Sequence, residues 1–212
     1  MTTNRPALIT TACAIVGGGP AGLMLGLLLA RAGVDVTVIE AHADFLRDFR
    51  GDTIHPSTLD VMKEIGLLDG LLALPHTQAP RLDAEIGGRT VTMADFSRLP
   101  TACRFIAFMP QWDFLDYVAK AAARYPHFRL LMATRMTGLM ETDGRVRGLT
   151  AAGPEGEIEI RCDLVVGADG RKSRVREAAG LVVERFGSPR DVLWMKLSRQ
   201  PDDPPFTMGH AG

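Results

Sequence analysis

The first forty residues alternate between short apolar runs and one longer apolar stretch with helical spacing. Residues 12–16 form an apolar run of strand length, Leu23 to Leu29 read as the buried face of a helix, and Val34 to Ile39 form a second strand-like run. Three glycines at 17–19 separate the first run from the helix, and Glu40 closes the second strand. These positions predict a strand, a glycine turn, a helix and a strand, which together make a βαβ unit.

The middle of the chain carries signals for both helices and strands. Pro56-Ser57-Thr58 reads as a helix start, with the helix ending at Gly66, and Asp69 to Leu74 reads as a further helical turn. Gln111 to Tyr125 has the apolar spacing of an amphipathic helix. The predicted strands are Leu82–Ile86 and Thr90–Met93 as a hairpin, then Phe105–Met109, Phe128–Ala133, Arg135–Glu141, Val146–Thr150, Glu157–Ile160 and Val192–Leu197.

One late run identifies the fold class. Asp163 to Val166 is fully apolar after its first residue, as expected for a central parallel strand, and a short helix is predicted over Ser173 to Ala179. We therefore expect an α/β fold that begins as a parallel sheet, makes an antiparallel β excursion, and returns to the first sheet with this run. The prediction is a Rossmann-like dinucleotide-binding domain.

The glycine turn has the spacing of a dinucleotide-binding fingerprint. Gly17 allows the chain to turn sharply after the first strand, and Gly19 has no side chain that would keep a pyrophosphate from the backbone. Gly22 allows the helix to pack closely on that strand. A structural glycine turn without a ligand is the alternative interpretation.

The start of the helix and the end of the second strand complete this fingerprint. Pro20 and Ala21 open the helix, whose first N–H groups and positive dipole end favour phosphates. Glu40 can accept hydrogen bonds from a ribose hydroxyl. Together, these residues predict a dinucleotide site.

Composition excludes several other classes. The 24 Lys and Arg residues nearly balance the 25 Asp and Glu residues, so no basic face for nucleic acid is expected. A signal peptide over residues 7–32 is conceivable, but the three glycines and Pro20 would break its helix, and a membrane span would need about 20 uninterrupted apolar residues. Three widely spaced cysteines predict buried thiols in a reducing cytoplasm, and five histidines without metal-ligand spacing predict no metal site.

Three stretches together resemble the FAD-dependent aromatic hydroxylases of the p-hydroxybenzoate hydroxylase class. The first is the glycine turn with Glu40, and the second runs from Arg50-Gly51 through Ile54-His55-Pro56 to Ile65-Gly66-Leu67. The third and most specific is the stretch 166–176, Val-Gly-Ala-Asp-Gly-Arg-Lys-Ser-Arg-Val-Arg, which resembles the Asp-Gly motif of that family. The resemblance reaches from the first strand to about Leu197, and the choice of FAD over NAD depends on it.

The resemblance implies further cofactor-binding residues. Asp169 and Gly170 correspond to the motif that helps to hold the FAD pyrophosphate and is implicated in NAD(P)H binding. A carboxylate would repel a pyrophosphate, so Asp169 would act through a ribose hydroxyl, a water or a backbone N–H, with a helix N-cap as the alternative role. Arg50 would contact the ribose and phosphate region, with Arg47 as a competitor. Gln111 would lie along the ribityl chain, although a helix-start glutamine that faces water is nearly as good an interpretation.

Two basic residues after the motif and one histidine have weaker roles. Arg174 and Arg176 could bind a phosphate of NAD(P)H, but a solvated helix face is the preferred interpretation. His55 lies in the flavin-adjacent stretch, where packing is the preferred interpretation.

The implied activity is aromatic hydroxylation. In the resembled family, NADH or NADPH reduces FAD, O₂ is captured as a flavin C4a-hydroperoxide, and oxygen is transferred to an aromatic ring, so no catalytic side chain is named. Members of the family are longer than this chain, and the expectation is therefore a fragment that retains FAD weakly and does not hydroxylate alone. The expected domains are residues 1–75 and 101–185 for FAD binding, 76–100 for the start of a substrate sheet, and 186–212 for an incomplete substrate domain.

Two other classes remain open on the sequence alone. An NAD(P)-dependent dehydrogenase domain explains the glycine turn and Glu40 but not Asp169-Gly170 after a late apolar strand. A non-catalytic nucleotide-binding module would use the same fold as a scaffold. The oligomeric state and the substrate are not indicated by any residue pattern.

Overall fold

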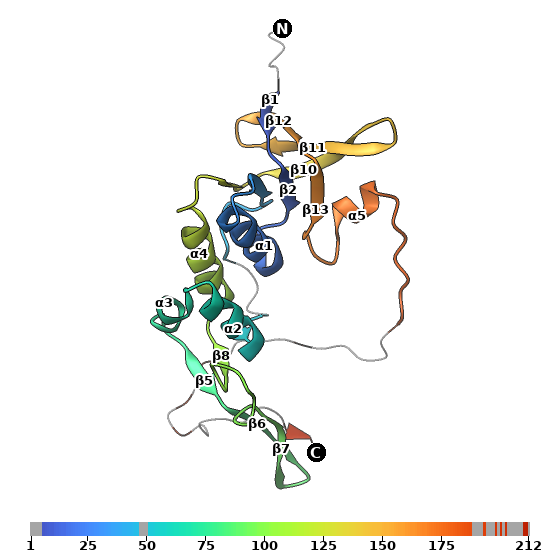
Figure 1. Cartoon of the computed structure of the whole chain (residues 1–212). Helices are drawn as coiled ribbons and strands as arrows, with labels where there is room; N and C mark the ends of the chain where they lie inside the picture. The colour runs from blue at the N-terminus through green and yellow to red at the C-terminus, as the bar shows by residue number, and fades with distance from the viewer. Residues whose placement is uncertain are drawn as a thin grey trace. The chain divides into compact units, whose positions relative to one another are not determined.

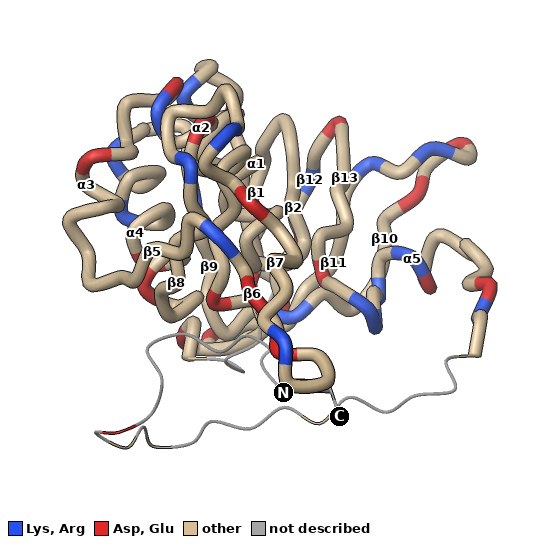
Figure 2. Tube along the Cα trace, turned by 90° about the horizontal axis from the view of Figure 1, so that it is seen from below, with Lys and Arg blue, Asp and Glu red and all other residues tan. Residues whose placement is uncertain are grey.

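The structure is a computed structural model that divides into two compact units. It describes residues 6–46 and 51–187, together with Leu193, Ser198, Gln200, Asp202, His210 and Ala211. The first unit comprises Met1–Leu46 and Leu115–Ser188, and the second comprises Arg47–Phe114 and Pro189–Gly212. Acidic and basic residues are interspersed along the described trace (Figure 2).

A parallel sheet forms the centre of the first unit. Its strand order is β13-β2-β3-β9, with β2 at Cys13–Val16, β3 at Val36–Ile39, β9 at Phe128–Leu131 and β13 at Leu164–Gly167. All three neighbouring pairs are parallel. The chain leaves β2 through α1 (Pro20–Arg31) toward β3 on one side, whereas β13 lies on the other side of β2. The strand order therefore reverses at β2, which is where ligands bind in open α/β sheets.

Helix α1 covers one face of this sheet, and a glycine allows the close approach. Leu23, Leu27 and Ala30 are buried on the helix. A Cβ at Gly26 would lie 2.8 Å from Val38 Cγ2 and 2.9 Å from Phe128 Cε2, so only a glycine fits there without a shift. The period-two alternation of β-strands then turns the neighbours of Val38 toward the opposite face.

A second sheet covers that opposite face. Its order is β1-β12-β11-β10, with bounds Ala7–Thr10, Gly156–Arg161, Arg145–Gly153 and Arg135–Thr142. Strands β10, β11 and β12 are an antiparallel meander, whereas β1 pairs with β12 in parallel. The buried residues that join the two sheets are Ala14, Val16, Ile39, Met136, Leu149, Ala151, Ile160 and Cys162. Helix α5 (Arg174–Ala178) follows β13 and lies beside it and β10 (Figure 1).

The second unit holds two small sheets and short helices. One sheet has the order β4-β8-β5, with β4 at Thr53–Ile54, β8 at Ile106–Phe108 and β5 at Thr77–Ala79. The other has the order β14-β6-β7, built on the hairpin of β6 and β7. The remaining bounds are Arg81–Ile86 for β6, Arg89–Asp95 for β7, His210–Ala211 for β14, Pro56–Glu64 for α2, Leu68–Leu72 for α3 and Gln111–Ala122 for α4, which continues into the first unit.

The structure confirms the predicted fold class, with parallel and antiparallel sheets in one α/β chain. Each predicted helix and the predicted hairpin are present, with ends that differ by a few residues. The sequence analysis missed β1, β4, β5 and β14. The strand predicted over Val192 to Leu197 lies outside the described residues except for Leu193. Within the part of the chain that the structure describes, no helix has the length and hydropathy needed to cross a membrane.

Candidate cofactor site

The glycine turn and the Asp169 loop meet at the carboxyl ends of β2 and β13. Gly17 has φ +109°, and a Cβ there would overlap Ala168 O and lie 2.8 Å from the Asp169 nitrogen. The Gly17 N–H donates to Ile39 O at 2.8 Å, and the Ala168 N–H donates to Val16 O at 2.7 Å. The structure therefore brings two of the predicted site segments into direct backbone contact.

Gly19 and Gly22 differ in their surroundings as the fingerprint predicts. A Cβ at Gly22 would overlap Gly17 O and lie 3.3 Å from Ile15 Cγ2, so this glycine is required by helix packing. At Gly19, by contrast, a Cβ would have none of the described atoms within 4 Å. The backbone at Gly19 consequently faces open space, which is where a ligand could approach it.

The start of α1 has features of an anion site. Gly19 is the N-cap, Pro20 occupies the first turn, and no side chain among the described residues caps the helix. The first turn contains no acidic residue, and the Leu23 N–H closes the first helical bond to Gly19 O at 2.9 Å. The amides of Ala21 and Gly22 precede that bond, so the positive end of the helix dipole and its unpaired donors point out of the turn.

Glu40 follows β3 and lies against the glycine turn. The residue is 6% exposed, its Oε2 accepts the Gly18 N–H at 2.8 Å, and its Oε1 accepts the His42 N–H at 2.9 Å. A Cβ at Gly18 would lie 2.9 Å from Glu40 Cβ, so the middle glycine is needed to admit the carboxylate. Backbone donors thus hold the carboxylate against the glycine turn.

His42 contacts Glu40, and the sequence analysis did not pair these two residues. Its Nδ1 lies 2.8 Å from Glu40 Oε1, and its side chain is 58% exposed whereas that of Glu40 is 8% exposed. The signal for this pair in the sequence is the Glu-X-His spacing at the end of the predicted strand. The carboxylate at the strand end is thus one half of a pair.

The two carboxylate oxygens of Asp169 have different surroundings. Its Oδ2 accepts the Arg174 N–H at 2.6 Å and the Val175 N–H at 3.3 Å, so it helps to cap α5. Ser173 is the N-cap, with its Oγ accepting the Arg176 N–H at 3.0 Å.

Asp169 Oδ1 is buried and has no hydrogen-bond partner among the described residues. A buried acceptor is costly unless a donor reaches it, so this atom suits a ligand hydroxyl or a water. The next residue, Gly170, has φ +77° and open space around it.

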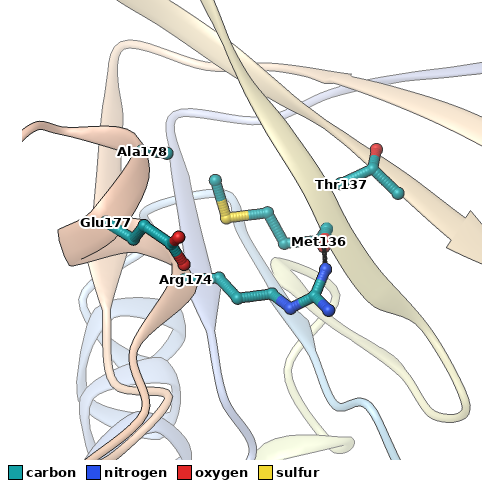
Figure 3. A pocket seen from close by; sticks show the side chains of 5 residues that line it. All are labelled: Met136, Thr137, Arg174, Glu177 and Ala178. Carbon is teal, nitrogen blue, oxygen red and sulfur yellow. Dashed lines mark hydrogen bonds between the residues drawn. The ribbon is translucent and has the colours of Figure 1, made fainter.

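The two arginines of α5 fold back onto the protein. The Arg174 Nη1 donates to Met136 O at 3.4 Å, and the Arg176 Nη2 donates to Arg171 O at 2.6 Å. Figure 3 shows Arg174 reaching across a cavity of about 310 Å³ toward β10. The residues that line this cavity are Met136, Thr137, Arg174, Glu177 and Ala178, and none of them belongs to the glycine turn. The arginines thus brace α5 and its preceding loop.

Two other predicted residues belong to the second unit. Arg50 and its competitor Arg47 lie outside the described residues. Gln111 begins α4, where its N–H donates to Asp52 Oδ1 at 3.0 Å and its Nε2 donates to Gly51 O at 3.5 Å. The side chain of Gln111 therefore folds back on the loop that follows Arg50 in sequence.

The three cysteines are free and buried, as predicted. Burial raises the pKa of the Cys13, Cys103 and Cys162 thiols. Among residues 6–46, 51–187 and the few described beyond them, no group of His, Cys, Asp and Glu could hold a metal ion.

A family model and named relatives both match most of this chain. A family model described as "FAD binding domain" matches residues 10–211. The 6-methylpretetramide 4-monooxygenase of Streptomyces rimosus is 36% identical over 185 residues, which are 87% of this chain and 44% of that protein. The 3-(3-hydroxy-phenyl)propionate/3-hydroxycinnamic acid hydroxylase of Klebsiella pneumoniae is 29% identical over 211 residues, with 95% and 37% covered.

Solved structures show the same likeness. The p-nitrophenol 4-monooxygenase PnpA from Pseudomonas putida matches with a TM-score of 0.75 at 25% identity, covering 85% of this chain and 46% of that one. A ternary complex of aklavinone-11 hydroxylase with FAD and aklavinone matches with a TM-score of 0.68 at 25% identity, covering 80% and 35%. This chain therefore spans less than half the length of each of these four proteins.

Proposed function

Because this chain belongs to the FAD binding domain family, we propose that it supplies the FAD-binding portion of a monooxygenase that hydroxylates a small aromatic molecule. NADH or NADPH is the proposed electron donor, O₂ the second substrate and the cytoplasm the location. Relatives whose printed names are monooxygenase and hydroxylase support the reaction class. The proposed domain division remains the one expected from the sequence.

The observation that carries this proposal is the backbone contact between Gly17 and the Ala168–Asp169 segment. The glycine fingerprint and the Asp-Gly motif thus lie together at the carboxyl ends of β2 and β13, and β2 is the strand at which the order reverses. A dehydrogenase with a single glycine fingerprint does not require the second motif at this edge. The contact therefore favours FAD over NAD as the resident dinucleotide.

The residues present fit FAD in three respects. The open backbone at Gly19 and the uncapped start of α1 would receive the pyrophosphate. Glu40, fixed by Gly18, would accept a hydroxyl of the adenosine ribose. Asp169 Oδ1 would accept a hydroxyl of the ribityl chain or an ordered water, which would satisfy an otherwise orphaned acceptor.

Bound FAD would supply the redox and oxygen chemistry, and this chain's residues would hold and orient it. Asp169 would do so from a loop that its own Oδ2 ties to the start of α5. Arg174 and Arg176 would keep that helix against the meander and the loop. These bonds would hold the Asp169 loop and α5 in one arrangement, which orientation of a large cofactor requires.

The test is a titration of the purified chain with FAD, FMN and NADH, followed by flavin fluorescence and by thermal unfolding. We expect FAD to bind at least about tenfold more tightly than FMN, because only FAD carries the adenosine diphosphate half that the glycine turn would hold. NADH should raise the unfolding temperature less than FAD does. A chain that is stabilised by NADH but not by FAD would instead be a dehydrogenase domain, and indifference to all three would refute the proposal.

A further inference from the structure

The pair formed by Glu40 and His42 offers an inference beyond the proposed function. The carboxylate is held from two sides, with Oε2 on the Gly18 N–H and Oε1 on both the N–H and Nδ1 of His42. The Oε1 contacts measure 2.9 Å to the backbone nitrogen and 2.8 Å to the ring nitrogen.

The tautomer of His42 follows from this geometry. An ionised carboxylate can only accept hydrogen bonds, so Nδ1 must carry the proton that bonds Glu40 Oε1. The side chain of His42 is 58% exposed, so this contact lies at the surface. The ring is therefore oriented by the carboxylate, and the carboxylate by the ring.

The backbone around the pair is held independently of the imidazole. The Glu40 N–H donates to Leu131 O at 2.8 Å, and the Thr134 N–H donates to Glu40 O at 2.7 Å. The His42 carbonyl accepts the Ala133 N–H at 2.7 Å. A side-chain substitution at His42 should thus leave the path of the chain in place.

We propose that His42 is a positioning residue that fixes Glu40 for the adenosine ribose of FAD. A ribose hydroxyl is a directional donor, and a carboxylate can accept from it only while the carboxylate keeps its orientation. Gly18 fixes one oxygen and His42 the other. This inference rests on the proposed function, because it assigns the ribose of the resident FAD to Glu40.

Three variants separate this role from simple packing. His42→Ala removes the ring and its donor, whereas His42→Phe keeps the ring bulk without the donor. His42→Asn places an amide N–H at the same number of bonds from Cβ as Nδ1, so it should restore the contact to Glu40 Oε1. Each variant is compared with the wild type in the unfolding temperature of the chain without cofactor.

The experiment measures the dissociation constants of FAD and of an FAD analogue whose adenosine carries 2′-deoxyribose. We expect His42→Ala and His42→Phe to weaken FAD binding about tenfold, and His42→Asn to stay within about twofold of the wild type. The analogue should bind the wild type about tenfold more weakly than FAD but lose little further in His42→Ala, because the two changes remove the same interaction.

The outcomes distinguish this inference from the proposed function. If the wild-type chain binds no FAD, the proposed function fails and this inference with it. If the wild type binds FAD and His42→Ala binds it equally well, only this inference fails. It fails equally if the losses in the analogue and in His42→Ala simply add, or if His42→Asn does not restore the affinity.

Discussion

Replacing Gly19 with alanine is a perturbation that should separate cofactor binding from folding. Gly19 has φ −75° and ψ −176°, which any residue adopts, and an added Cβ would meet none of the described atoms within 4 Å. Alanine at Gly19 should therefore be accommodated by the protein alone. The methyl group would project into the space that the pyrophosphate is proposed to occupy.

The expected effect on folding is small because two contributions oppose one another. Alanine is a poorer N-cap than glycine for α1, by about 0.5–1 kcal/mol. Replacing a glycine in a compatible conformation stabilises by about 0.4–1 kcal/mol through the unfolded chain. The unfolding free energy of the chain without cofactor should consequently change by less than about 1 kcal/mol.

The expected effect on FAD is larger. A hydrogen bond from a backbone N–H to a charged phosphate contributes about 1.5–3 kcal/mol. Losing one such bond through the added methyl group would weaken FAD binding by about 10- to 100-fold. Flavin fluorescence titration measures this change, and urea unfolding without FAD measures the stability.

Gly187→Ala is the matched control, since a Cβ at Gly187 likewise meets none of the described atoms and the backbone there is not in the left-handed region. It should change neither quantity. Wild-type FAD affinity in Gly19→Ala would refute the assignment of the pyrophosphate to this turn. A large loss of stability in Gly19→Ala without cofactor would refute the claim that the space is open.

Three further predictions follow from the site and the core. Gly33→Ala, at φ +79° in open space, should lower the free energy of unfolding in urea by about 1 kcal/mol, from left-handed backbone strain alone. Gly17→Ala should lower it by about 1–3 kcal/mol more, because its Cβ would also clash with Ala168. Equal losses in the two variants would contradict the contact between Gly17 and Ala168. Asp169→Ala and Ser173→Ala should each weaken the α5 cap by about 1 kcal/mol, but only Asp169→Ala should also weaken FAD binding, and a parallel loss in Ser173→Ala would show that the effect is structural. Burial raises the pKa of the Cys13 and Cys162 thiols, so the folded state keeps their protons at pH values where the unfolded chain loses them. The free energy of unfolding should therefore fall as the pH rises above about 8.5. Iodoacetamide should label both thiols rapidly only in urea.

The βαβ unit and the late parallel strand could be predicted because their signals are local. The glycines, the apolar runs and Glu40 lie within one stretch of sequence, and Asp163 to Val166 is a continuous apolar run after its first residue. The expectation of a central, buried strand was wrong for this run, because β13 lies at the edge of the described parallel sheet and Leu164 is 57% exposed. Strand β1 was missed because it pairs in parallel with β12, about 150 residues later in the chain, and its half-exposed residues lack a distinct alternation. Strands β4 and β14 have two residues each and β5 has three, too few for a periodic signal.

The candidate site was predictable in its backbone but not in its side-chain pairing. The need for glycine at 17 and 22 follows from spacing, and the structure supplies the atoms that require it. The pairing of His42 with Glu40 depends on how the chain turns after β3, which the bonds of residues 133 and 134 determine. Likewise, only the folded arrangement shows that Asp169 uses one oxygen on α5 while the other has no partner among the described residues.

The start of α1, which no described side chain caps, connects the supply of FAD to the cellular level of the folded protein. If the helix is completed by its ligand, then occupancy is also folding stability, and FAD at about 100 times its dissociation constant would add ~2.7 kcal/mol. In a cell short of riboflavin, a larger fraction of newly made chains would be unfolded, and proteases would degrade more of them. Vitamin supply would then set the abundance of the protein as well as its activity.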